Sequence, residues 1–171
     1  MALPRACGTD GTIGGMDKLY MIAYKDLDSS AGDPATITSG IISAIALESG
    51  KTFVEVGLLR NSADVTEKFA NDFAKGTAFI TQTLKVVLSG LTPANLAFVQ
   101  SVQSQSVGIL FKNRSGSYYF MGGNGRFQLK DYESGSGTAE ADMQGFTLNF
   151  EGTGIDPIRE VDPTLIASIV S

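Results

Sequence analysis

The feature of this sequence that most constrains its fold is the stretch 64–88, which reads as two long strands joined by a turn at 74–76. In the second strand, side chains alternate with a period of two residues between a mostly apolar face and a mostly polar one. The first face holds Ala78, Ile80, Gln82, Leu84, Val86 and Leu88, and the second holds Thr77, Phe79, Thr81, Thr83, Lys85 and Val87. Such alternation is typical of a half-buried strand.

The length of this predicted hairpin, here called the hairpin arm, points to assembly. A typical strand has about 5–6 residues, and the second strand of the arm reaches about twice that. We expect such an arm to extend past its own domain and to need another subunit to cover it. The first strand has an alternative interpretation as a short helix, because Val65, Phe69 and Phe73 follow a helical spacing after a capping Ser62. The strand is preferred because the second strand needs a partner.

The rest of the chain is predicted to consist of further strands and one helix. The helix begins at Thr92-Pro93, a good capping pair, and ends near Gln103. The apolar C-terminal run 165–170 is expected either to add a strand to its own sheet or to dock on a neighbouring subunit. Predicted strands are 17–24, apolar on both sides, 41–47 and 52–59 as a pair, 107–111 and 117–121 as a hairpin, and 144–151, with loops at 25–40 and 132–138.

Composition limits the class of protein. A chain of 171 residues with 43% hydrophobic and 18% charged residues fits one globular domain. The net charge of −5 argues against a protein that grips nucleic acid phosphates, although it leaves open one that handles nucleic acid by repelling it. Residues 1–11 lack the apolar core of a signal peptide and no run approaches a membrane span, so we expect synthesis in a cytoplasm and no membrane insertion.

The sequence offers little catalytic chemistry. It has no histidine and a single cysteine, Cys7, which removes the commonest general base, an internal disulfide and a Cys/His zinc site. The glycine run 122–125 lacks the ending of a phosphate loop, and residues 26–37 fit a calcium loop poorly. Four acidic residues are candidates for paired catalytic carboxylates and are interpreted as solvated surface: Glu140, Asp142, Glu55 and Glu67. No catalytic, metal-binding or cofactor-binding residue is predicted, and we expect no enzyme.

Four segments, taken in order, resemble a known family. They are a glycine entry into the first strand at 14–23, the hairpin 63–88, a second hairpin with an Asn-x-x-Gly tip at 107–122, and a closing strand at 145–152 followed by a proline-containing tail. In this order the chain resembles the tail tube proteins of tailed bacteriophages. The long loop 25–40 and the apolar tail after Pro163 depart from that pattern.

The resemblance implies a mainly β fold, a two-sheet β-barrel or sandwich with one flanking α-helix and the long hairpin arm. It implies one domain over 1–171, with a flexible N-terminus (1–15) and C-terminal tail (155–171). In that family the subunits form six-fold rings that stack into the tail tube of the virion. DNA passes through the lumen without specific binding, and other tail proteins are partners. No cofactor is implied.

Two sets of residues follow as candidates for this assembly. The subunit-interface candidates are Phe69, Phe73, Phe79, Ile80, Leu165 and Ile166. The lumen candidates are Asp64, Glu67, Asp72 and Glu140. An acidic wall repels phosphate, so a duplex would slide along it, whereas a basic wall would hold it.

Other functions remain open at this point. The tube of a contractile injection or secretion system has the same architecture. A monomeric β-barrel that binds a small ligand, or an enzyme that uses carboxylates alone, would instead need a pocket with convergent polar groups. The long arm and the apolar tail favour the self-assembling tube.

Overall fold

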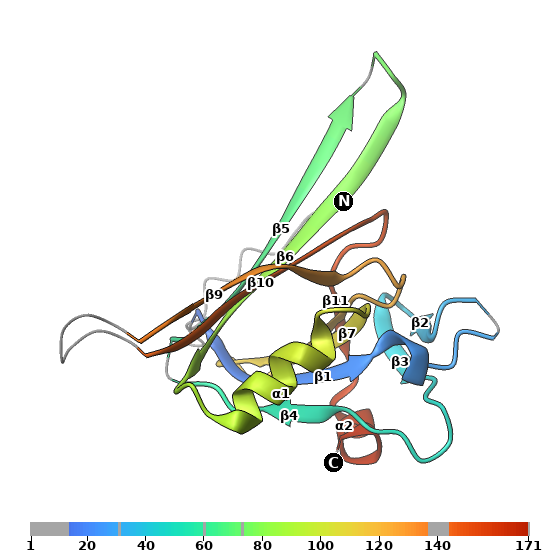
Figure 1. Ribbon diagram of the computed structural model, residues 1–171. Coiled ribbons are helices and arrows are strands. Elements are labelled where there is room, and N and C mark those ends of the chain that lie inside the picture. Colours follow the sequence, from blue (N-terminus) through green and yellow to red (C-terminus); the bar gives the residue numbers. More distant parts are fainter. Residues whose placement is uncertain (1–13, 31, 60, 73, 137–143, 171) are drawn as a thin grey trace.

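The computed structural model describes residues 14–30, 32–59, 61–72, 74–136 and 144–170. The fold is mainly β and built from two sheets, which confirms the predicted fold class, and the sheets stack as a sandwich without closing into a barrel. Figure 1 shows helix α1 lying across one side of the sandwich and one long hairpin projecting from it.

The larger sheet has seven strands in the order β2-β3-β11-β8-β7-β1-β4. These strands are β1 (Met16–Ala23), β2 (Ala35–Thr38), β3 (Ile41–Ile45), β4 (Val54–Val56), β7 (Val107–Asn113), β8 (Tyr118–Met121) and β11 (Arg159–Val161). A short 3-10 helix, η1 (Tyr24–Asp26), follows β1. The prediction that 41–47 and 52–59 pair with each other is wrong, because β3 joins β2 and β11 while β4 pairs with β1 at the far edge. The predicted loop 25–40 likewise contains η1 and β2.

The smaller sheet has four strands in the order β5-β6-β10-β9, each antiparallel to the next. Its strands are β5 (Ala63–Asp72), β6 (Thr77–Ser89), β9 (Gln128–Gly135) and β10 (Gly145–Gly154). The helical alternative for residues 65–73 is wrong, because β5 pairs with β6 residue by residue from Ala63↔Val86 to Asp72↔Thr77. Most of the predicted loop 132–138 belongs to β9. The pairing of β9 with β10 is interrupted by a bulge between Asn149 and Phe150.

The main core lies between the two sheets and under α1 (Pro93–Val102). Alternate residues of β6 and β10 face alternate residues of β1 and β7 there; Leu84, Phe150 and Leu19 are almost fully buried. The helix begins as predicted, since the Thr92 side chain accepts a hydrogen bond from the backbone N–H of Asn95. Its buried residues are Val99 and Val102.

A second core lies on the opposite face of the larger sheet. Tyr20 and Ile22 of β1 point into it while Leu19 and Met21 point into the first, so this strand is buried on both faces, as predicted. The second core is covered by the chain's C-terminal residues, which form helix α2 (Pro163–Ile169).

The C-terminal segment differs from both alternatives that the sequence suggested. Residues predicted as a flexible tail hold β11, which is hydrogen-bonded between β3 and β8, and α2, which packs on its own subunit. Asp162 caps α2 by accepting hydrogen bonds from the backbone N–H and the hydroxyl of Thr164, at 2.9 and 2.7 Å, and Pro163 occupies the first turn. This cap and proline are a helix start, which outweighs the strand preference of the isoleucines that follow.

Candidate functional site

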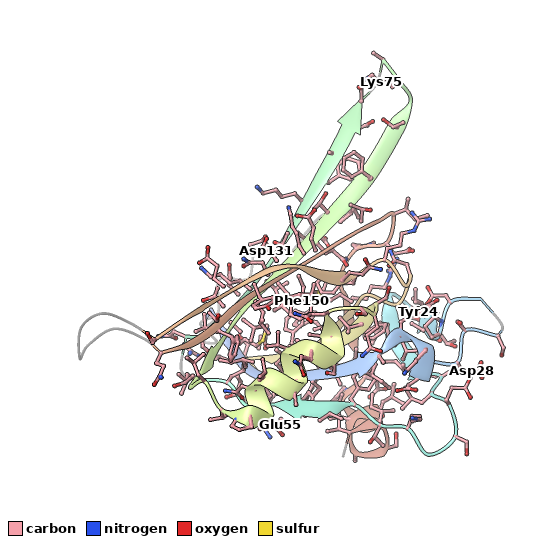
Figure 2. The ribbon with its side chains drawn as sticks, in the orientation of Figure 1. Tyr24, Asp28, Glu55, Lys75, Asp131 and Phe150 are labelled. Carbon is pink, nitrogen blue, oxygen red and sulfur yellow. The ribbon has the colours of Figure 1, made fainter. Side chains whose placement is uncertain are left out.

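The distal part of the hairpin arm, residues 69–79, has no third strand beside it among the described residues. Strand β10 pairs with β6 only from Ser89 to Ile80, and its last pair is Gly154↔Ile80. Beyond that point the described residues of β5 and β6 pair only with each other, and Figure 1 shows this part of the hairpin standing clear of the sandwich. Figure 2 shows Lys75 at its far end. A two-stranded ribbon of this kind is marginally stable in water without further packing.

Two exposed phenylalanines lie on opposite faces of this distal arm. Phe69 is 67% exposed and pairs across the hairpin with Ile80, which is 8% exposed. Phe79 is 45% exposed and pairs with Ala70, so it points to the other side. The interface candidates on the arm are therefore divided between its two faces. Phe73, the fourth, lies outside the described residues.

The base of the arm is tied to the body through Glu67. Its carboxylate oxygen Oε2 accepts hydrogen bonds from the backbone N–H of Ile158 at 2.7 Å and from Gln82 Nε2 at 3.0 Å. Gln82 Nε2 also lies 3.2 Å from the carbonyl oxygen of Asp156. Glu67 was predicted to share a lumen surface with Asp64 and Asp72. It points to the opposite side of β5 and has a structural role there.

The outer face of the four-stranded sheet, turned away from the sandwich core, is mostly polar, with Phe79 and Val87 as its larger apolar side chains. Its register places on this one face Asp64, Thr66, Lys68 and Asp72 of β5, Thr81, Thr83 and Lys85 of β6, Thr147, Asn149, Glu151 and Thr153 of β10, and Asp131 and Glu133 of β9. Two of the lumen candidates, Asp64 and Asp72, are among them. The fourth candidate, Glu140, lies outside the described residues.

Charges on this outer face are of both signs, with acidic groups in excess. Lys130 Nζ forms an ion pair with Glu151 at 2.7 Å, and the hydrogen bond to that carboxylate raises the pKa of Lys130 above its ordinary value. Asn149 Nδ2 donates to Asp131 Oδ1 at 2.6 Å. Sequence reasoning missed the contribution of β9 because it interpreted 132–138 as a loop. The bulge places Leu129 and Tyr132 on the same face although they are three residues apart, so no period-two signal marks this strand in the sequence.

Both edges of the four-stranded sheet are largely open. Strands β5 and β9 are its outermost strands, and within the described residues their outward sides are unpaired except for one bridge between Gln128 of β9 and Ser106. An unpaired edge presents a row of backbone N–H and C=O groups, which is a template for pairing with another chain. Charged residues on β5, among them Lys68, are of the kind that discourages unspecific pairing at such an edge.

The remaining candidate residues lie elsewhere. Leu165 and Ile166 are half-buried on α2, where they pack against the second core of their own subunit. The glycine run 122–125 forms a turn after β8, closed by a hydrogen bond from Gly125 N–H to the Gly122 carbonyl. Asp28 accepts a hydrogen bond from the Ser30 backbone at 3.0 Å, and bonding to Ser30 lowers its pKa. Within the described residues no three His, Cys, Asp or Glu side chains converge as a metal site would require, and no helix there is long and apolar enough to span a membrane.

Comparison with known proteins adds no relative: no family model, no curated protein and no solved structure matches this chain. The chain is thus placed by its fold, a two-sheet β-sandwich with an extended hairpin, and by the surfaces described above.

Proposed function

We propose that this protein is the subunit of a self-assembling tube, with the tail tube of a bacteriophage virion as the member of that class that its sequence resembles. The supporting observation is the four-stranded sheet, which combines two largely open edges, a polar outer face with acidic groups in excess, and an arm with exposed phenylalanines on both faces. In this proposal the protein forms the wall of the tube and has no catalytic role.

The strand order suits closure into a ring. The four strands alternate in direction, so when a neighbouring copy is related by rotation, β9 of one copy and β5 of the next run antiparallel. The alternation therefore continues from subunit to subunit without a parallel pair. Joining two different edges is a heterologous contact, which generates a ring when the rotation closes. Six copies form the ring in the family that the sequence resembles.

The distal arm provides the contact between stacked rings. Because Phe69 and Phe79 lie on opposite faces, one partner surface cannot cover both. An arm inserted between parts of neighbouring subunits buries both phenylalanine side chains. This burial stabilises the contact by about 25 cal/mol for each Å² of apolar surface removed from water. In this arrangement the outer face of the four-stranded sheet lines the channel, and its threonines and acidic groups offer few sites that hold a phosphate.

Shortening the arm tests the assembly. Replacing residues 70–79 with Asn-Gly, a turn that favours tight hairpins, retains Phe69, Ile80 and the Glu67 contacts and removes no buried residue among those described. We expect the wild-type protein to form rings or tubes at high concentration in negative-stain micrographs. The shortened variant should unfold thermally like wild type in dilute solution and remain unassembled. Tubes formed by the shortened variant would exclude the arm as the stacking element, and a wild-type protein that is monomeric at all concentrations and salts would exclude the tube itself.

Charge reversal tests the conduit. Changing Asp64, Asp131 and Glu133 to lysine converts the proposed channel surface to a basic one without altering the core. We expect such tubes to retain duplex DNA in a salt-dependent manner, because neutralised phosphates release counterions. Wild-type tubes should not retain it. The matched control reverses Glu48, Glu55 and Glu160, which lie outside the four-stranded sheet. Equal retention by the two triple variants would contradict the assignment of the channel face.

A further inference from the structure

Lys68 lies near the middle of the open edge strand β5 and has no acidic partner on its own subunit. Its side chain is exposed on the outer face of the four-stranded sheet, with Thr81 of β6 directly opposite. None of the ion pairs between described residues involves Lys68. It is therefore an ammonium group in need of a partner, on a strand whose outward side is unpaired within the described part of the chain.

The other edge of the same sheet carries the complementary charge. Strand β9 presents Asp131 and Glu133 on the outer face, and both side chains are exposed. The one basic residue within β9, Lys130, already forms an ion pair with Glu151. Two carboxylates on this edge thus remain without a cation, whereas the β5 edge has a cation without a carboxylate.

The two edges can meet in only a few registers. Because the outer faces of both strands must match, Asp131 of one copy lies opposite an even-numbered residue of β5 in the next. A single row across each sheet consists of Asp64, Lys85, Asn149 and Asp131. Without any shift between copies, Asp131 would therefore face Asp64, and a shift of two residues would bring Glu133 opposite Asp64. Like charges directly opposite each other destabilise a pair of strands.

A shift of four residues, from Asp64 to Lys68, forms two favourable pairs at once. On the outer face it sets Asp131 against the unpaired ammonium group of Lys68. On the inner face, beyond the bulge residue of β9, it sets Leu129 against Phe69. Leu129 already packs against the main core, and Phe69 is 67% exposed, so this pair continues the core into the next copy.

The geometry of closed sheets favours the same shift. Copies related by rotation lie at one height along the axis, so the shift per copy sets the tilt of the strands. Four residues advance about 13 Å along the strands and four strands span about 19 Å, which gives a tilt of about 35°. Closed sheets typically tilt by about 35–45°. A shift of six residues gives about 46° and leaves Leu129 opposite the polar Asn71.

We propose that Lys68 of one copy binds Asp131 of the next copy and so sets the register of the ring. This inference rests on the proposed self-assembly and names the contact that joins β5 to β9. The outward side of β9 is open from Leu129 onward, because Gln128 pairs with Ser106. In this register that open part covers β5 up to Phe69. Residues 70–79 stay outside the junction and remain available to the next ring.

Disulfide cross-linking tests the register. Thr66→Cys and Glu133→Cys lie opposite each other across the proposed junction, and Cys7→Ser removes the native thiol. Within one subunit two strands separate these positions by about 14 Å, too far for a disulfide. Under mild oxidation of assembled protein, we expect a ladder of covalent multimers on a non-reducing gel. The matched controls pair Thr66→Cys with Asp131→Cys or Gly135→Cys, which represent shifts of two and six residues and should cross-link much more slowly.

A charge swap tests the ion pair itself. Lys68→Glu and Asp131→Lys should each raise the protein concentration needed for assembly by about fivefold, because like charges then face each other. Combining the two should restore assembly to within about twofold of wild type. The effect of each single change should shrink in high salt. Lys25→Glu, an exposed lysine outside the four-stranded sheet, is the matched control and should assemble like wild type. The triple lysine variant proposed for the channel should likewise need more protein to assemble.

Each other outcome has a definite meaning. If wild type assembles and the swapped pair is no better than the single variants, the ion pair is refuted and the tube proposal stands. If the Asp131→Cys or Gly135→Cys control cross-links fastest, the register is refuted but the junction of β5 with β9 stands. If tubes form and no cysteine pair cross-links, that junction is refuted as well. If wild type never assembles, the tube proposal and this inference both fail.

Discussion

Phe150 and Phe69 lie on the same face of the same sheet, yet one is 1% exposed and the other 67%. Phe150, on β10 within the body, stacks against Phe127 with ring centroids 6.1 Å apart. Phe69, on the arm, lies opposite Ile80, the last residue of β6 that pairs with β10. Figure 2 shows how far the arm continues beyond the region of Phe150. The apolar face thus continues past the point where the chain's own residues cover it, which is the pattern expected when another molecule completes the core.

The largest effect on the isolated subunit is expected in the body. Phe150→Ala should lower the free energy of unfolding by about 3–5 kcal/mol, because it removes a buried ring and leaves a cavity beside Phe127. Denaturant unfolding of dilute protein measures this loss. A loss below about 1 kcal/mol, typical of surface sites, would show that this part of the sheet is not the packed core described here.

An intermediate effect is expected at the junction between body and arm. Glu67→Ala removes the acceptor for Ile158 N–H and one acceptor for Gln82, and should cost about 1–2 kcal/mol of unfolding free energy. Glu67→Gln keeps an acceptor oxygen and should lose less. Asp64→Ala, on the opposite face of the same strand, serves as the control. Equal losses at Glu67 and Asp64 would remove the distinction between the two faces of β5.

A smaller, pH-dependent effect is expected at α2. Hydrogen bonds from the backbone and the hydroxyl of Thr164 lower the pKa of Asp162 below its ordinary 3.8. The ionised cap therefore stabilises the fold above the ordinary carboxyl pKa, and this contribution is lost as the pH falls through the lowered value. Asp162→Asn should melt at a lower temperature than wild type near neutral pH, and the two melting curves should converge in acid. A difference that stays constant across this range would contradict the assignment.

The smallest effect on the isolated subunit is expected at Phe69. Since most of its side chain is already exposed, Phe69→Ala should change the free energy of unfolding of the dilute protein by no more than about 0.5 kcal/mol. The same change should suppress assembly, whereas Phe69→Leu, which keeps much of the apolar surface, should largely preserve it. Assembly by Phe69→Ala at wild-type concentration would remove this residue from the proposed contact. This pair of measurements, made beside Phe150→Ala, separates folding from assembly most directly.

The sequence predicted the elements whose signals are local. Period-two alternation predicted β6 and β10, and the Thr92-Pro93 pair predicted the start of α1. Whether a stretch pairs with its neighbour in sequence or with a distant strand depends on contacts that alternation does not encode, so the separation of β3 from β4 was missed. The start of α2 was visible in Asp162-Pro163, but the isoleucines after it suggested a strand.

For the candidate surfaces, the sequence indicated that the arm is exposed but did not show which side chains lie on which of its two faces. Glu67 is two residues from both Val65 and Phe69 and so lies on the same face of the strand, whereas Asp64 and Thr66 belong to the other face. This alternation can be read from the sequence alone. The contacts of Glu67 with Ile158 and Gln82 were not, because they join segments far apart in the chain. The same holds for Lys68, whose lack of an acidic partner on its own subunit depends on which strands lie beside β5.

The bulge between Asn149 and Phe150 has a consequence for any closed ring of these subunits. An extra residue on one strand increases the local twist and bends the sheet. That bend contributes to the turn from one copy to the next, and the turn per copy fixes how many copies complete the circle. In the proposed tube, this single irregularity would help to set the diameter of the pore, and with it the size of what can pass through.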